Sequence, residues 1–126
     1  MASNLDPIPG CDHHSVGGLE VDVVRVGAGR MKRIVYPPGF RWSTHMQPVV
    51  KTDHCLHTHV GFLVQGHMQG VYEDGCTYEF VAPQFAVIEA GHDGWVVGDE
   101  PAVFIQYDFE EGTARRFGVA ERHGHG

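Results

Sequence analysis

Short runs of alternating apolar and polar residues fill most of the chain, and turn residues separate them. Residues 19–26 and 30–36 alternate with the period of two that is typical of half-buried strands. Further extended runs cover residues 40–46, 53–66, 67–72, 76–81, 85–88, 95–97 and 102–109. A series of about eight to ten short strands with little helix predicts an all-β sandwich or barrel.

Glycine, proline and aspartate mark the turns between these runs. Pro37-Pro38-Gly39 and Asp74-Gly75 are the clearest signals, and Asp-Gly supplies the positive φ of a tight hairpin. No internal repeat divides the chain of 126 residues, a length that fits a single domain. We expect an irregular N-terminal arm over residues 1–18, a β-barrel over residues 19–112, and a C-terminal tail over residues 113–126 that could begin with a short helix.

The run at residues 53–66 carries the chemistry. If it is extended, His57 and His59 lie on one face of the strand, because alternate side chains of a strand point the same way. Neutral imidazole is the commonest protein ligand for divalent metals, so this pair forms a small chelating surface. Cys55 shares that face, either as a further ligand or as a small buried hydrophobe. His54 falls on the opposite face and is expected in solvent.

Composition limits the classes of partner. The net charge is −7, with sixteen acidic and nine basic residues, which argues against nucleic acid or an anionic membrane as partner. No apolar run approaches the ~20 residues of a membrane span, and the N-terminus lacks a signal-peptide pattern. The three cysteines are widely spaced and do not form a disulfide pattern. A cytoplasmic location is the expectation.

The remaining ligands must come from the other histidines, of which the chain has ten in all. Those near the chain ends and beyond the Gly66 break are expected at the surface: His13, His14, His67, His123 and His125. His45 lies in a predicted strand and His92 in a predicted turn, so both could meet the His57 and His59 pair. A metal site needs three or four ligands from neighbouring strands. The candidate ligands are therefore His45, His57, His59 and His92.

Residues 37–109 resemble the cupin superfamily, the small double-stranded β-helix barrels of jelly-roll type. The pattern from Pro38-Gly39 to His45 is similar to the opening of the first cupin motif, and His57-Thr58-His59 with the run ending at Gly66 is similar to its close. Residues 86–92 resemble the second motif. The whole arrangement is similar to a group of small bacterial single-domain cupins. The resemblance implies a divalent transition metal (Zn, Fe, Ni or Mn) inside the barrel.

The chain departs from the family pattern at two ligand positions. Counted back from Gly66, the usual glutamate position falls on His59, and the usual histidine of the second motif is replaced by Gly94. His92, two residues before Gly94, shares its face if the strand is regular. An all-histidine site suits Zn, Fe, Ni or Cu better than Mg or Ca. The register between Gly39 and Gly66 decides whether Cys55 or His57 faces the metal.

The resemblance implies a metal-dependent enzyme acting on a small organic substrate, with dioxygenase chemistry for iron and isomerase or cyclase chemistry for zinc or nickel. The alternative is a non-catalytic cupin that binds or senses a small ligand. Arg41 could meet an anionic substrate or pair with a carboxylate. A homodimer formed through an edge strand is also expected, because jelly-roll barrels leave edges that pair.

Overall fold

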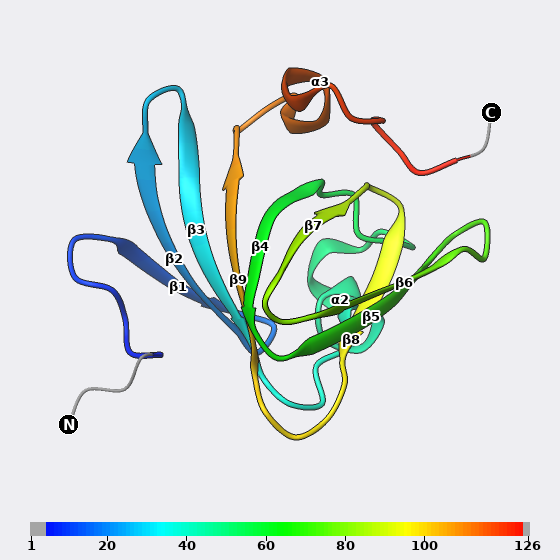
Figure 1. Cartoon of the computed structure of the whole chain (residues 1–126), viewed down its shortest axis with the longest axis horizontal. Helices are drawn as coiled ribbons and strands as arrows, with labels where there is room; N and C mark the ends of the chain where they lie inside the picture. The colour runs from blue at the N-terminus through cyan, green and yellow to red at the C-terminus, as the bar shows by residue number, and fades with distance from the viewer. Residues whose placement is uncertain (1–4, 125–126) are drawn as a thin grey trace.

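Two antiparallel β-sheets enclose the core in the computed structural model, which describes residues 5–124 (Figure 1). The larger sheet has six strands in the order β1-β2-β3-β9-β4-β7, and the smaller has three in the order β6-β5-β8. The strands are β1 (Asp12–Val16), β2 (Leu19–Val26), β3 (Gly29–Tyr36), β4 (His59–Gln65), β5 (His67–Tyr72), β6 (Thr77–Val81), β7 (Gln84–Ile88), β8 (His92–Val96) and β9 (Ala102–Asp108). The all-β prediction is confirmed.

The core lies between the two sheets, and burial follows the period of two most clearly along β5 and β8. Leu63 on β4 and Phe104 on β9 are register partners, and both side chains are almost completely buried. Full burial of one such side chain contributes about 1.5–3 kcal/mol. Next to Leu63, a Cβ on Gly61 would lie 2.0 Å from the carbonyl oxygen of Ile105. Any side chain at position 61 would collide with the β9 backbone, so only glycine allows β4 and β9 to pair here.

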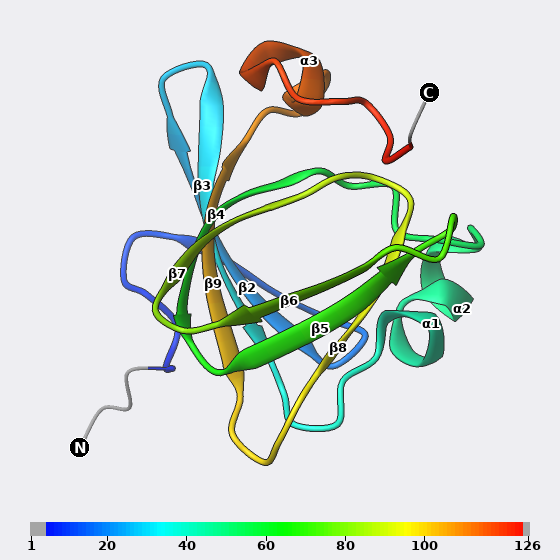
Figure 2. The same cartoon turned by 45° about the vertical axis from the view of Figure 1, so that its right-hand side comes forward.

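The strand predicted at residues 40–46 is wrong, because this segment folds into the short helix α1 (Trp42–His45), followed by α2 (Gln47–Val50). A carboxylate from β8 determines where α1 starts. The backbone N–H of Ser43 donates to Asp93 Oδ1 at 3.0 Å, and Trp42 is buried beneath the helix. Figure 2 shows both helices on one side of the barrel.

The N-terminal segment is less irregular than predicted, since residues 12–16 form β1 and pair with β2. His13, predicted as a surface histidine, contacts Asp22 at 2.9 Å and Glu20 at 2.7 Å on β2. These contacts attach the N-terminal segment to the large sheet.

The C-terminal segment returns to the barrel instead of extending from it. Helix α3 (Thr113–Phe117) lies above one end of the barrel, and the chain then runs toward the β5–β6 side (Figures 1 and 2). Arg122 donates two hydrogen bonds to Glu73, of 2.5 and 2.8 Å. The prediction of a surface histidine at position 123 is wrong, because the His123 side chain is only 14% exposed. His125 lies outside the described residues.

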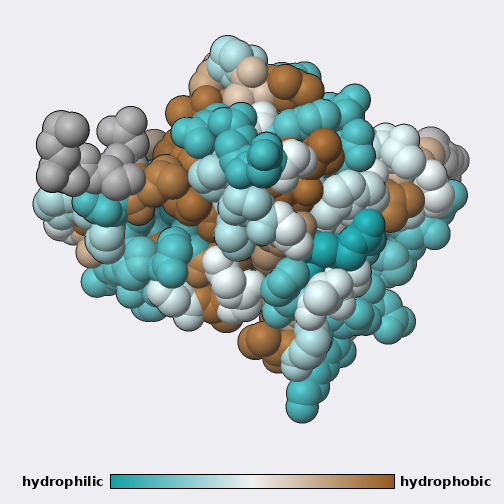
Figure 3. Space-filling model, turned by 90° about the horizontal axis from the view of Figure 1, so that it is seen from below, coloured by the Kyte–Doolittle hydropathy of each residue, from teal (hydrophilic) through white to brown (hydrophobic). Residues whose placement is uncertain are grey.

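The end of the barrel opposite α3 shows hydrophilic residues mixed with several separate hydrophobic patches (Figure 3). Among residues 5–124, no helix has the length and apolar character that a membrane crossing requires.

Candidate functional site

A cavity of about 620 Å³ lies inside the barrel, within the usual range of small-molecule sites. Its walls come from both sheets, from the segment before β4 and from α3. Apolar side chains such as Ile34, Phe40 and Phe104 line it, together with a few polar groups. Arg30, at the start of β3, pairs with Asp108 at the end of β9, which places these polar groups at the α3 end of the barrel.

Three potential metal ligands converge on the cavity wall, namely Cys55, His59 and His92. Their donor atoms all lie within 4.8 Å of one another, and Cys55 Sγ is 4.0 Å from His59 Nε2. His59 begins β4 and His92 begins β8, whereas Cys55 precedes β4. An isolated β-bridge joins Cys55 to His92, with the Cys55 N–H donating to the His92 carbonyl oxygen at 2.7 Å. This bridge brings the cysteine to the histidines.

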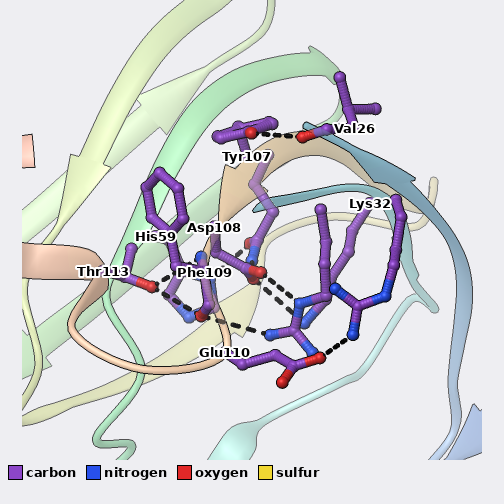
Figure 4. Close-up of polar contacts among 11 residues, drawn as sticks. Val26, Lys32, His59, Tyr107, Asp108, Phe109, Glu110 and Thr113 are labelled. Atoms are coloured by element: carbon purple, nitrogen blue, oxygen red, sulfur yellow. Dashed lines mark hydrogen bonds and ion pairs between the residues drawn. The ribbon is translucent and has the colours of Figure 1, made fainter. Parts of the chain in front are cut away.

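The His59 ring is oriented by a chain of hydrogen bonds that ends in a carboxylate (Figure 4). Asp108 only accepts hydrogen bonds, so Gln106 donates to it through Nε2 at 2.8 Å. The side-chain oxygen of Gln106 then accepts from His59 Nδ1 at 2.8 Å. Nε2 of His59 therefore faces the Cys55 thiol and is the atom that could bind a metal ion.

The His92 ring is oriented in the same way by the backbone. Its Nδ1 donates to the carbonyl oxygen of Glu89 at 2.7 Å, which again leaves Nε2 as the acceptor atom. The inward face of β8 carries His92, Gly94 and Val96, so the predicted shared face of positions 92 and 94 is confirmed. A Cβ on Gly94 would lie 2.6 Å from the Tyr78 hydroxyl, so this oxygen takes the space where the family pattern has a ligand.

Burial determines the protonation of the three groups. Burial, and next the nearby His92, lower the pKa of His59 to about 3. Burial likewise lowers the pKa of His92 to about 4, although its bond to Glu89 opposes this. Burial raises the pKa of the Cys55 thiol to about 11. At neutral pH both imidazoles are therefore neutral and the thiol is protonated.

Two of the predicted ligands, His45 and His57, are not in this group of three. His45, on α1, is exposed, stacks on Phe40 and contacts the Arg41 carbonyl oxygen at 3.1 Å. His57 lines the cavity, but its ring centroid is 6.4 Å from that of His59, and it is not in the group of three. The structure brings together only His59 and His92 of the predicted set, and it adds Cys55. Metal binding by any of these residues stays a prediction.

Sequence reasoning missed the polar residues at the α3 end of the cavity. Asp108 accepts hydrogen bonds from Arg30 at 2.9 Å and ion-pairs with Lys32 at 3.1 Å. Their position on the inward face of β3 and β9 could have been found from the strand periodicity, but a lone polar residue in a predicted strand gives no chemical signal. Arg41 pairs with Asp93 at 3.3 Å and covers the Trp95 ring. Of the two alternatives predicted for Arg41, the structure therefore shows the pairing with a carboxylate.

Comparison with known proteins identifies the fold. A "Cupin 2 conserved barrel domain protein" from Salinispora arenicola aligns over 94% of this chain and 98% of its own, with a TM-score of 0.58 and 15% identity. The Cnp3 cupin domain of Schizosaccharomyces pombe aligns over 89% of this chain and 78% of its own, with a TM-score of 0.55 and 10% identity. Protein NMB1881 from Neisseria meningitidis aligns over 71% and 82%, with a TM-score of 0.51 and 12% identity.

Neither a family model nor a curated protein matches the sequence. The structural similarity shows that the chain has the cupin fold, which confirms the prediction of a jelly-roll barrel.

Proposed function

We propose that this cupin barrel binds a divalent transition metal through Cys55, His59 and His92, and acts as a metal-dependent enzyme on a small organic molecule in the cavity. The observation that carries the proposal is the convergence of one thiol and two oriented imidazoles on the wall of a cavity of about 620 Å³. Three protein ligands and an open position facing a cavity are typical of catalytic metal sites.

The donor set indicates the class of metal. Thiolate and imidazole are soft and borderline ligands, which suit Zn²⁺, Fe²⁺ or Ni²⁺. Mn²⁺ prefers oxygen ligands and fits this set less well. A metal bound here would supply Lewis-acid activation of a substrate or water, or O₂ chemistry if it is iron.

The protein's own residues would bind and orient the substrate. Arg30 and Lys32 flank the carboxylate of Asp108 and offer cationic donors to an anionic group at the α3 end of the cavity. Two further carboxylates line the cavity, Glu110, which is paired with Arg25, and Glu121. Apolar walls would exclude water from the rest of the substrate. These features favour a small organic acid.

Metal analysis of untagged protein tests the binding half of the proposal. We expect wild-type protein to retain a transition metal, and Cys55→Ser, His59→Ala and His92→Ala each to lose it from this site. His67→Ala and Cys11→Ser are matched controls, because both residues lie outside the group of three. Retention of metal at this site by all three folded variants would exclude it.

A panel of small carboxylic acids tests the catalytic half. Each metal-loaded sample is incubated with the panel under aerobic and anaerobic conditions, and the products are measured by mass spectrometry. We expect conversion that needs the metal and is lost in His59→Ala. Saturable binding without conversion would favour the non-catalytic alternative.

A further inference from the structure

A second group of potential metal ligands lies on the outside of the barrel, where the C-terminal segment meets the β5–β6 hairpin. Asp74 and Cys76 come from the hairpin turn, and His123 comes from the C-terminal segment. The donor atoms of the three residues all lie within 4.8 Å of one another. His123 Nε2 is already 3.2 Å from Asp74 Oδ2.

The His123 ring is oriented as a ligand would be. Its Nδ1 contacts Glu89 Oε1 at 3.0 Å, and its ring stacks on Tyr72 with centroids 3.7 Å apart. The backbone N–H of His123 donates to the Ala90 carbonyl oxygen at 3.0 Å. A carboxylate on Nδ1 directs Nε2 outward as the ligating atom, an arrangement common in metal sites. This Nε2 is directed at the hairpin turn.

The three donors suit zinc in type and spacing. Thiolate, imidazole and carboxylate are all zinc ligands, with bonds of about 2.0–2.3 Å. In a tetrahedral site such bonds place the ligand atoms about 3.3–3.8 Å apart. The 3.2 Å between His123 Nε2 and Asp74 Oδ2 is close to this value, and no pair of donor atoms is wider than 4.8 Å, so none has to close by more than about 1.3 Å.

We propose that Asp74, Cys76 and His123 form a second zinc site that fastens the C-terminal segment to the β5–β6 hairpin. Water fills the fourth position, and the Cys76 thiol releases its proton to solvent when the metal binds.

The proposed site is connected to the cavity through two residues of the described chain. The Glu89 side chain contacts His123, while the Glu89 carbonyl oxygen accepts from His92 of the inner group. Glu121, two residues before His123, lines the cavity. Fastening His123 therefore fixes both the position of Glu121 at the cavity and the support of His92.

Zinc stoichiometry of the untagged full-length chain tests the proposal. In competition with a chromophoric chelator, the wild-type protein should bind two Zn²⁺ ions per chain if the inner site is also occupied. Cys76→Ser and Asp74→Asn should each bind one ion fewer than wild type. Cys11→Ser is the matched cysteine control and should bind as wild type does. Cys11 immediately precedes β1, which Figure 1 shows on the other side of the molecule from the β5–β6 hairpin.

Cys55→Ser separates this proposal from the proposed function. It removes an inner ligand only, so a further loss of one ion in the double variant Cys55→Ser/Cys76→Ser belongs to the second site. If Cys55→Ser binds as wild type does but Cys76→Ser loses an ion, the inner site fails and the second site stands.

Trypsin supplies a readout of the fastening itself. The bond after Arg122 precedes the proposed ligand His123, so saturating zinc should slow its cleavage by more than about tenfold in wild type and in Cys55→Ser. In Cys76→Ser the protection should be absent. Equal zinc binding and equal protection in wild type, Cys76→Ser and Asp74→Asn would overturn the proposal.

Discussion

The orientation of His59 depends on a single amide, that of Gln106. Gln106 is buried and joins His59 to Asp108, and Asp108 is held in turn by Arg30 and Lys32. In this series of hydrogen bonds, the His59 N–H donates to the Gln106 oxygen and the Gln106 N–H donates to the Asp108 carboxylate. A residue that touches no metal therefore determines which nitrogen of His59 faces the other two ligands.

Replacing this amide should weaken metal binding without removing a ligand. We expect Gln106→Leu to lower the zinc affinity of the inner site by about 10–100-fold, because the His59 ring loses its acceptor. Competition with a chelator measures the change, with Cys76→Ser as background so that only the inner site is counted. Gln69→Leu is the control, since Gln69 bonds Glu79 on the small sheet. An unchanged affinity in folded Gln106→Leu would contradict the assignment.

The thiol of Cys55 should make metal binding depend on pH. Its pKa of about 11 means that it is protonated at pH 7, whereas the pKa values of about 3 and 4 leave both imidazoles neutral. Binding one ion should therefore release about one proton at pH 7, and the affinity should rise about tenfold per pH unit. Calorimetry in buffers of different ionisation enthalpy, again in Cys76→Ser, measures the proton. Release that persists after Cys55→Ser would contradict this account.

At the scale of elements, strands could be predicted from the sequence where burial alternates along the chain, as it does in β5, β6 and the second half of β9. Helix α1 could not be predicted, because a helix of four residues is too short to show a helical period. In addition, the carboxylate that accepts from the Ser43 N–H in its first turn belongs to Asp93, 50 residues further along the chain. Whether Cys55 is a ligand or a buried hydrophobe could not be decided from the sequence for a similar reason. The regular strand starts only at His59, and the pairing of Cys55 with His92 is non-local.

Asp22 connects three elements at the N-terminal edge of the large sheet. It is 1% exposed and accepts from His13 on β1, from the Ile8 N–H and from Arg33 on β3. Burial alone would raise the pKa of Asp22, but the bonds from His13, Ile8 and Arg33 together hold it below its usual value. The ionised carboxylate therefore stabilises the folded chain.

Removing this carboxylate should destabilise the protein in a pH-dependent way. We expect Asp22→Ala to lower the free energy of unfolding at pH 7 by about 3 kcal/mol, because Arg33 loses a buried partner. Because the folded pKa is depressed, the contribution is present above the unfolded value of about 3.9 and is lost as the pH falls through the folded value. Urea unfolding at pH 7 and at lower pH should show the difference from wild type shrinking in acid. Glu20→Gln, an exposed neighbour, should cost less at every pH.

At the scale of the whole molecule, the outer surface of β7 is apolar and exposed. β7 is an edge of the large sheet, and Phe85 and Val87 on its outer face are 80% and 45% exposed. Val64 of the neighbouring β4 and Val81 of β6 are also exposed. An edge strand with exposed apolar side chains can pair with a strand of another chain. In a two-fold dimer, both chains contribute the same surface patch to the interface.

We therefore expect a homodimer in which β7 lies at the interface, and Phe85 as its largest exposed side chain contributes most. Phe85→Ser should weaken the dimer at least about tenfold, since an aromatic anchor at the centre of an interface is worth 2 kcal/mol or more by truncation. Sedimentation equilibrium over a range of concentrations measures the dissociation constant. Val49→Ser removes an exposed apolar residue from α2, away from β7, and should leave the dimer intact. A monomeric wild-type chain, or equal effects of both substitutions, would contradict a homodimer through β7.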